Sequence, residues 1–174
     1  GLERLIDDFY QISLLEAGQY PFYYGKVELC SLLTEILLDN YSTFSVNGIE
    51  PQIEIPDVNI YLNADRKACI RIIQNLIFNA ITSTTSNVVV QLIYNTDSVQ
   101  LCIKNPIATI PTEEYSKLLE RFYVADISRS NGTSGQGLYI VKKLLLVHYK
   151  GGDRNGFEKL FNRCPAHWNS NERY

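Results

Sequence analysis

The hydrophobic period of the sequence changes near residue 88, and this change constrains the fold more than any other feature. From about Asp65 to Ile81 the apolar residues recur at helical spacing, and Asp65 is placed to cap that helix. Beyond it, residues 88–94 and 99–104 are β-branched and apolar runs on either side of residues 95–98, a pattern that predicts a β-hairpin. The chain therefore combines helices with an antiparallel pair of strands.

The remaining segments extend this pattern. Helical spacing also occurs within residues 2–15, from 29 to 41 with an end near Gly48, and within 137–149, while short strands are expected after Lys26, at 52–55 and at 59–62. Because helices and strands fall into separate groups, we expect the α+β class, a two-layer sandwich of a mixed sheet with helices on one face. Residues 105–135 are long and rich in Pro and Gly, with a short helical piece around 113–122, and are typical of a lid.

Composition excludes several classes of protein. With 174 residues, 45% hydrophobic and 20% charged, the chain fits one folded domain with an appendage. The net charge of −3 offers no broad basic surface, so nucleic acid is not expected as a partner. The cysteines are far apart and are expected as buried reduced thiols, not zinc ligands.

The ends of the chain carry separate expectations. No run approaches the ~18 to 20 apolar residues of a membrane span, and the start does not resemble a signal peptide. The chain begins without Met inside a helical pattern, so we expect a cytoplasmic piece of a longer protein whose membrane anchor lies upstream. The apolar stripe of residues 2–15 fits either packing on its own domain or an inter-subunit bundle.

Two polar motifs could carry chemistry. In the run NLIFNA, Asn75 and Asn79 are four residues apart, so both amides lie beside the apolar face of one helix, where they bind a ligand or simply hydrogen-bond one another. In GQGLYIVKK, Gly135 and Gly137 stand at a helix start, where backbone N–H groups and the helix dipole favour a phosphate, although glycines there are often turn residues. Between the motifs, Arg121 or Arg129 could meet that phosphate.

Together, NLIFNA, FYVADISRS and GQGLYIVKK resemble the asparagine box, lid aromatic box and glycine box of histidine kinases, members of the superfamily that includes gyrase, Hsp90 and MutL. The resemblance covers roughly residues 1–152 and implies a Bergerat-type ATP-binding fold. The opening LIDDFYQISLLEAG resembles the end of the family's second dimerisation helix, which favours the inter-subunit bundle. The implied organisation is a helix end at 1–18, a catalytic domain at 22–152 and a divergent tail at 153–174.

The resemblance also implies roles for individual residues. Asn79 would coordinate Mg²⁺ on the ATP phosphates with Asn75 beside it, and Asn75 stands where the superfamily's hydrolases often have a glutamate base. Since an amide cannot take a proton from water, phosphoryl transfer to a histidine fits better than hydrolysis. The implied catalytic and ATP-binding residues are Asn75, Asn79, Asn105, Arg121, Phe122, Tyr123, Arg129, Gly135, Gly137 and Leu138. The implied partners are a response regulator and the dimerisation helices of a homodimer.

Several positions depart from the family pattern. Asn105 replaces the aspartate that accepts a hydrogen bond from adenine, and the glycines that follow that aspartate are absent. Thr82 and Val124 replace two cations that face phosphate, and Gln136 replaces a leucine. The acceptor histidine is missing, because the two histidines lie at a helix end and in the tail.

Three hypotheses follow from this pattern. The first is a histidine kinase catalytic domain that binds ATP and Mg²⁺. The second is a degenerate module, similar to a pseudokinase, that acts by protein contacts with weak or no ATP binding. The third, an ATPase or serine kinase of the superfamily, is disfavoured by Asn75 and by the helix at residues 2–15.

Overall fold

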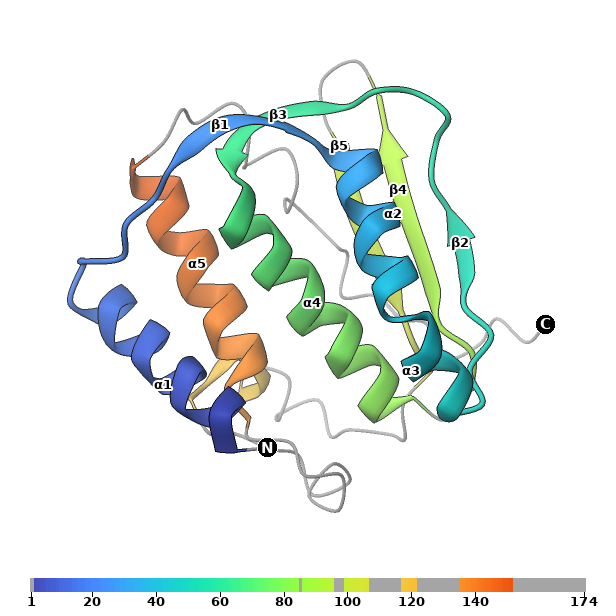
Figure 1. The fold of residues 1–174 in the computed structure, drawn as a ribbon, viewed down its shortest axis with the longest axis horizontal. Helices are drawn as coiled ribbons and strands as arrows, with labels where there is room; N and C mark the ends of the chain where they lie inside the picture. The colour runs from blue at the N-terminus through green and yellow to red at the C-terminus, as the bar shows by residue number, and fades with distance from the viewer. Residues whose placement is uncertain (1, 85, 96–98, 107–116, 122–134, 152–174) are drawn as a thin grey trace.

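The computed structural model describes residues 2–84, 86–95, 99–106, 117–121 and 135–151. Four helices lie side by side in the order α1 (Leu2–Glu16), α5 (Gly137–Gly151), α4 (Arg66–Ser83) and α2 (Leu29–Asp39), as Figure 1 shows. The short helix α3 (Tyr41–Val46) follows α2, and the strands lie along one end of the helices and beside α2 (Figure 1). The tail at 153–174 lies wholly outside the described residues, as does most of the expected lid. Of its helical piece at 113–122, residues 117–121 are described, and Lys117–Leu119 form one 3₁₀ turn.

The strands form two sheets. In the first, β1 (Tyr24–Glu28) pairs antiparallel with β3 (Tyr61–Asp65), so that Val27 lies opposite Leu62. In the second, β4 (Val89–Tyr94) pairs in parallel with β2 (Gln52–Glu54) and antiparallel with β5 (Val99–Lys104). The α+β class and the mixed sheet with helices are confirmed, as is the hairpin, and the single expected sheet is divided in two within the described residues.

Side-chain carboxylates begin two of the helices. Asp65 accepts a hydrogen bond from the backbone N–H of Ala68 at 2.8 Å, which confirms it as the cap of α4. Glu28 caps α2 by accepting from Ser31 N at 2.6 Å and Cys30 N at 3.2 Å, and it also accepts from the backbone of a neighbouring loop, from Ile60 N at 2.9 Å. Both helices are thereby fixed to the end of a strand.

The helix expected to run from residue 29 to about residue 47 is interrupted at Asn40. The side-chain Nδ2 and the backbone N–H of Asn40 both donate to the carbonyl of Ile36, at 2.8 and 3.2 Å, which ends α2. The amide thus competes with continued helix, as asparagine commonly does, and the chain restarts as α3.

The core lies between the helices and the sheets. Its fully buried side chains include Leu29 and Leu33 of α2, Ile72, Ile73 and Ile77 of α4, and Ile140 and Leu144 of α5. Helix α1 contributes only Ile12 and Leu15, whereas Leu2, Ile6 and Phe9 expose more than half of their surface. No helix among the described residues combines the length and the apolar character that crossing a membrane requires.

Candidate functional site

The glycine and asparagine motifs meet where α5 begins against α4. Gly137 is the first residue of α5, and a Cβ placed on it would lie 3.3 Å from Oδ1 and 3.6 Å from Cγ of Asn75. Asn75 itself is buried, with 2% of its surface exposed. The absence of a side chain at Gly137 therefore lets the start of α5 approach the asparagine helix closely.

The turn before α5 has the backbone that its glycines allow. Gly135 has a φ of +66°, a conformation that residues with a side chain rarely adopt. The carbonyl of Gln136 accepts from the N–H of Ile140 at 2.9 Å, which starts the helix, and Leu138 follows half-buried in the first turn. The N–H groups of this first turn have no acceptor within the helix, and the helix dipole adds to their attraction for an anion.

Further along α4, Asn79 lies one turn after Asn75 and is half-buried. One turn later still, the hydroxyl of Thr82 donates to the carbonyl of Phe78 at 2.9 Å and lies 3.3 Å from the carbonyl of Asn79. The hydroxyl is therefore directed at the backbone of its own helix, a common arrangement for threonine.

Asn105 directly follows β5 and is half-buried. Just after α4, the hydroxyl of Thr84 donates to the carbonyl of Ser86 at 2.7 Å and lies 3.3 Å from the carbonyl of Pro106. The segment that carries Asn105 therefore lies beside the C-terminal end of the asparagine helix.

Arg121 contacts α1. Its Nη1 lies 3.4 Å from Oε2 of Glu16, and its guanidinium carbon lies 5.5 Å from the centre of the Phe9 ring. The other oxygen of Glu16 accepts from the hydroxyl of Tyr139, on α5, at 2.8 Å. A role for Arg121 in phosphate binding stays a prediction. Phe122, Tyr123 and Arg129 lie outside the described residues.

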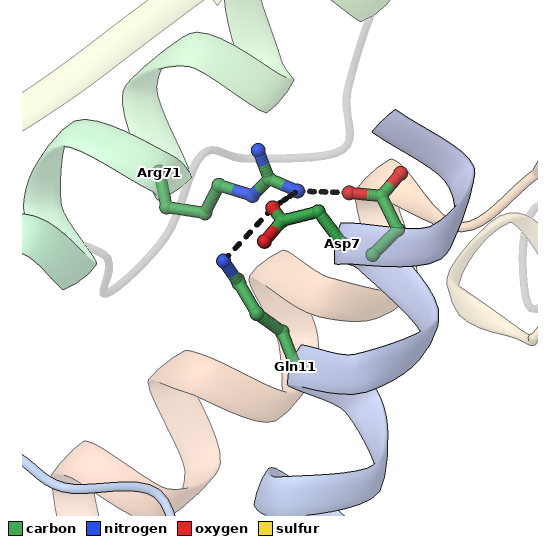
Figure 2. A network of polar contacts seen from close by, with 4 residues as sticks. Asp7, Gln11 and Arg71 are labelled. Carbon is green, nitrogen blue, oxygen red and sulfur yellow. Dashed lines mark hydrogen bonds and ion pairs between the residues drawn. The ribbon is translucent and has the colours of Figure 1, made fainter. Parts of the chain in front are cut away.

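A network of charged groups joins α1 to α4, and sequence reasoning missed it. Figure 2 shows Arg71 reaching from α4 to Asp7 on α1, where its Nη2 lies 3.2 Å from Oδ2 of Asp7. The same nitrogen pairs with Asp8, which is almost fully buried, and Gln11 donates to Asp7 at 3.1 Å. Two adjacent acidic residues in a mainly apolar helix were the visible signal, but their partner is far away in the sequence.

Burial also keeps the thiol of Cys69 neutral. It raises the pKa of Cys69, on α4, to about 12, with a further increase from the negative charge of Asp65. Cys69 and Cys102 are buried, Cys30 is half-buried, and none of these three forms a disulfide bond, so the expectation of reduced thiols is confirmed for them. A thiol with this pKa is not a nucleophile at neutral pH.

A polar hollow of about 640 Å³ lies beyond the end of α4, lined by residues that include Asn47, Thr82, Thr84 and Asn87. None of the described residues that line it belongs to the predicted ATP-binding set. Among the described residues, no group of three or more His, Cys, Asp or Glu side chains is placed to hold a metal ion.

Comparison with protein families gives one match. Residues 64–156 match the model described as "Histidine kinase-, DNA gyrase B-, and HSP90-like ATPase". Among curated proteins, the sensor histidine kinase YcbM of Bacillus subtilis (strain 168) is 26% identical over 153 residues, which cover 87% of this chain and 49% of YcbM. The chain thus spans about half the length of this relative.

Two solved structures share the fold. The histidine kinase AdeS of Acinetobacter baumannii superposes with a TM-score of 0.67 at 20% identity, covering 84% of this chain and 67% of that one. Full-length ShkA, in complex with AMPPNP, gives a TM-score of 0.68 at 20% identity and covers 84% of this chain and 31% of ShkA. At these identities the likeness concerns the fold alone.

Proposed function

Because the chain belongs to the histidine kinase-, DNA gyrase B- and HSP90-like ATPase family, we propose that it is the ATP-binding catalytic domain of a sensor histidine kinase. The observation that carries this proposal is the contact between Gly137 and Asn75, which brings the glycine and asparagine motifs together at one helix start. The family implies ATP binding. That the γ-phosphoryl group of ATP passes to a histidine is the part that we add.

The described residues fit a magnesium-bound triphosphate. The start of α5 offers backbone N–H groups to phosphate oxygens, and the missing side chain of Gly137 lets this helix start lie against Asn75. Asn79 would offer its side-chain oxygen to Mg²⁺, with Asn75 beside it. When bound, Mg²⁺ neutralises part of the phosphate charge. Residues of the chain then hold the γ-phosphate in position, and Asn105 accepts from adenine.

The proposed acceptor is a histidine, and the reason lies at Asn75. The buried amide at this position cannot act as a general base for water, so the site orients and neutralises the phosphate without activating a water molecule. The phosphoryl group would pass to a histidine on a dimerisation helix and from there to an aspartate of a response regulator. The exposed apolar residues of α1, among them Leu2 and Ile6, support α1 as the end of that helix in a homodimer.

We place this domain in the cytoplasm, in a longer protein with a membrane anchor. The placement in a longer protein is supported by YcbM, a sensor histidine kinase of which the chain covers 49%. The proposed organisation is the end of the dimerisation helix at residues 1–18, the catalytic domain at 22–152 and the tail at 153–174.

A degenerate module that acts by protein contacts is the second candidate, and the orientation of Thr82 favours it. Its hydroxyl is directed at the backbone of α4, so nothing at this position replaces the cation of the family pattern. The neutral Asn105 weakens adenine recognition further, because it lacks the charge of an aspartate.

Calorimetric titration with a non-hydrolysable ATP analogue, with and without Mg²⁺, separates the two candidates. We expect magnesium-dependent binding in the micromolar range, about −8 kcal/mol. Asn79→Ala should abolish the magnesium dependence, whereas Asn63→Ala, on the exposed face of β3, serves as the matched control. Absence of binding at millimolar analogue would favour the degenerate module.

The acceptor needs a separate experiment, because binding does not distinguish a kinase from an ATPase. The chain is mixed with radiolabelled ATP and a dimerisation-helix protein that carries its phosphoacceptor histidine. We expect acid-labile label on that protein and little free phosphate. Release of phosphate without protein labelling would instead indicate an ATPase.

A further inference from the structure

Gln136 is a polar residue at a buried position. It lies between Gly135 and Gly137 with 1% of its surface exposed, and its Oε1 receives no hydrogen bond from any residue in the described part of the chain. Burying an amide oxygen without a hydrogen-bond partner opposes folding, so packing alone does not account for this residue.

An apolar side chain would suit the position better if it served only the core. Leucine, the residue of the histidine kinase pattern here, has a similar size and no polar atoms to desolvate. The backbone already supplies the helix start, because the carbonyl of Gln136 accepts from Ile140 N at 2.9 Å. The side-chain amide of Gln136 is therefore not needed to start the helix.

In the sequence, Gln136 stands between the two glycines of the proposed phosphate site. The next residue, Gly137, opens α5 and approaches Oδ1 of Asn75, and Asn79 follows one turn along α4. A helix start attracts phosphate oxygens, which accept hydrogen bonds. Magnesium bound to a nucleotide commonly keeps several waters, which donate hydrogen bonds. A hydrated magnesium triphosphate thus offers both partners that a carboxamide requires.

We propose that the side chain of Gln136 binds the magnesium triphosphate of ATP, with its N–H donating to a phosphate oxygen and its carbonyl accepting from a magnesium-bound water. This inference rests on the proposed function. It gives the chain a neutral phosphate contact in place of the cations that are missing at Thr82 and Val124. The buried amide then obtains its hydrogen bonds only when nucleotide is present.

The test compares wild type with Gln136→Leu and Gln136→Met by thermal unfolding without ligand and by calorimetry with a non-hydrolysable ATP analogue. We expect both variants to unfold at the same temperature as wild type or higher, because the unsatisfied amide is gone. Affinity in Mg²⁺ should fall about tenfold, which corresponds to about 1.4 kcal/mol, and the loss should shrink without Mg²⁺.

The outcomes separate this inference from the proposed function. If wild type binds and both variants bind as tightly or more tightly, Gln136 is only a core residue and the inference is wrong. If wild type does not bind at all, the proposed function fails and the inference fails with it. Gln136→Met keeps the test valid should the branched leucine disturb packing, since methionine is unbranched and adapts to irregular space.

Discussion

Replacing Arg71 by methionine is expected to destabilise the fold by about 3 kcal/mol. The side chain of Asp8 is only 4% exposed, and that of Arg71 is 17% exposed. Removing one partner of a buried ion pair leaves the other charge uncompensated, which typically costs about 3–5 kcal/mol. We take the lower end of this range because part of the guanidinium still reaches solvent.

Two further variants define the origin of that loss. Asp7→Asn is the matched control, because the Asp7 side chain is 53% exposed and its pairing with Arg71 should contribute about 0–1 kcal/mol. The double variant Arg71→Met with Asp8→Leu should be more stable than Arg71→Met alone, since no buried charge then remains. Urea unfolding followed by circular dichroism gives each free energy of unfolding.

The reasoning would be refuted by additivity. If the loss in the double variant equals the sum of the losses in Arg71→Met and in Asp8→Leu alone, Asp8 and Arg71 are not coupled and the contact contributes nothing to docking α1. Equal losses in Arg71→Met and Asp7→Asn would likewise contradict the assignment of the energy to the buried partner.

Three other variants or probes test separate features. Burial raises the pKa of Glu28, but hydrogen bonds to its carboxylate outweigh burial and lower that pKa below its ordinary 4.5. Glu28→Gln should therefore reduce the free energy of unfolding by about 1 kcal/mol at pH 7. This difference from wild type should vanish as pH falls through the lowered pKa, as measured by urea unfolding at pH 7 and pH 3. In the folded chain, a thiol reagent at pH 8 should modify Cys30 far faster than Cys69, whose pKa is about 12, and equal rates by mass spectrometry would contradict the burial of Cys69. Gly137→Ala should weaken binding of the ATP analogue at least threefold in calorimetry, because the added Cβ would lie 3.3 Å from Oδ1 of Asn75 and displace that side chain. We expect little change in thermal stability. Unchanged affinity would count against a site shared by the glycine and asparagine motifs.

Local patterns in the sequence were sufficient to predict the elements whose hydrogen bonds join residues close together in the chain. The hairpin at 88–104 and the Asp65 cap depend on residues close together in the chain, and both were predicted correctly. The contact of Gly137 with Asn75 was accessible only through family resemblance, because the two residues lie on helices that the sequence does not pair.

Other features depend on side chains that compete with the backbone for hydrogen bonds, or on partners that are far apart in the sequence. The break at Asn40 follows from a side-chain amide that donates to the carbonyl of Ile36, a choice that hydrophobic periodicity does not register. The pairing of Asp8 with Arg71 joins residues 63 positions apart, and no local signal identifies which cation a buried carboxylate will meet. The same holds for Glu16, which contacts both Arg121 and Tyr139.

The carboxylate of Asp65 has a mechanical consequence. One oxygen caps α4 through Ala68, and the other accepts from the backbone N–H of Tyr23 at 2.5 Å, in the segment that leads from α1 to β1. A pull on that segment therefore acts on the first turn of the helix that carries Asn79, about 20 Å away at ~1.5 Å per residue. The buried side chain of Asp65 therefore links the first turn of α4 directly to the segment between α1 and β1.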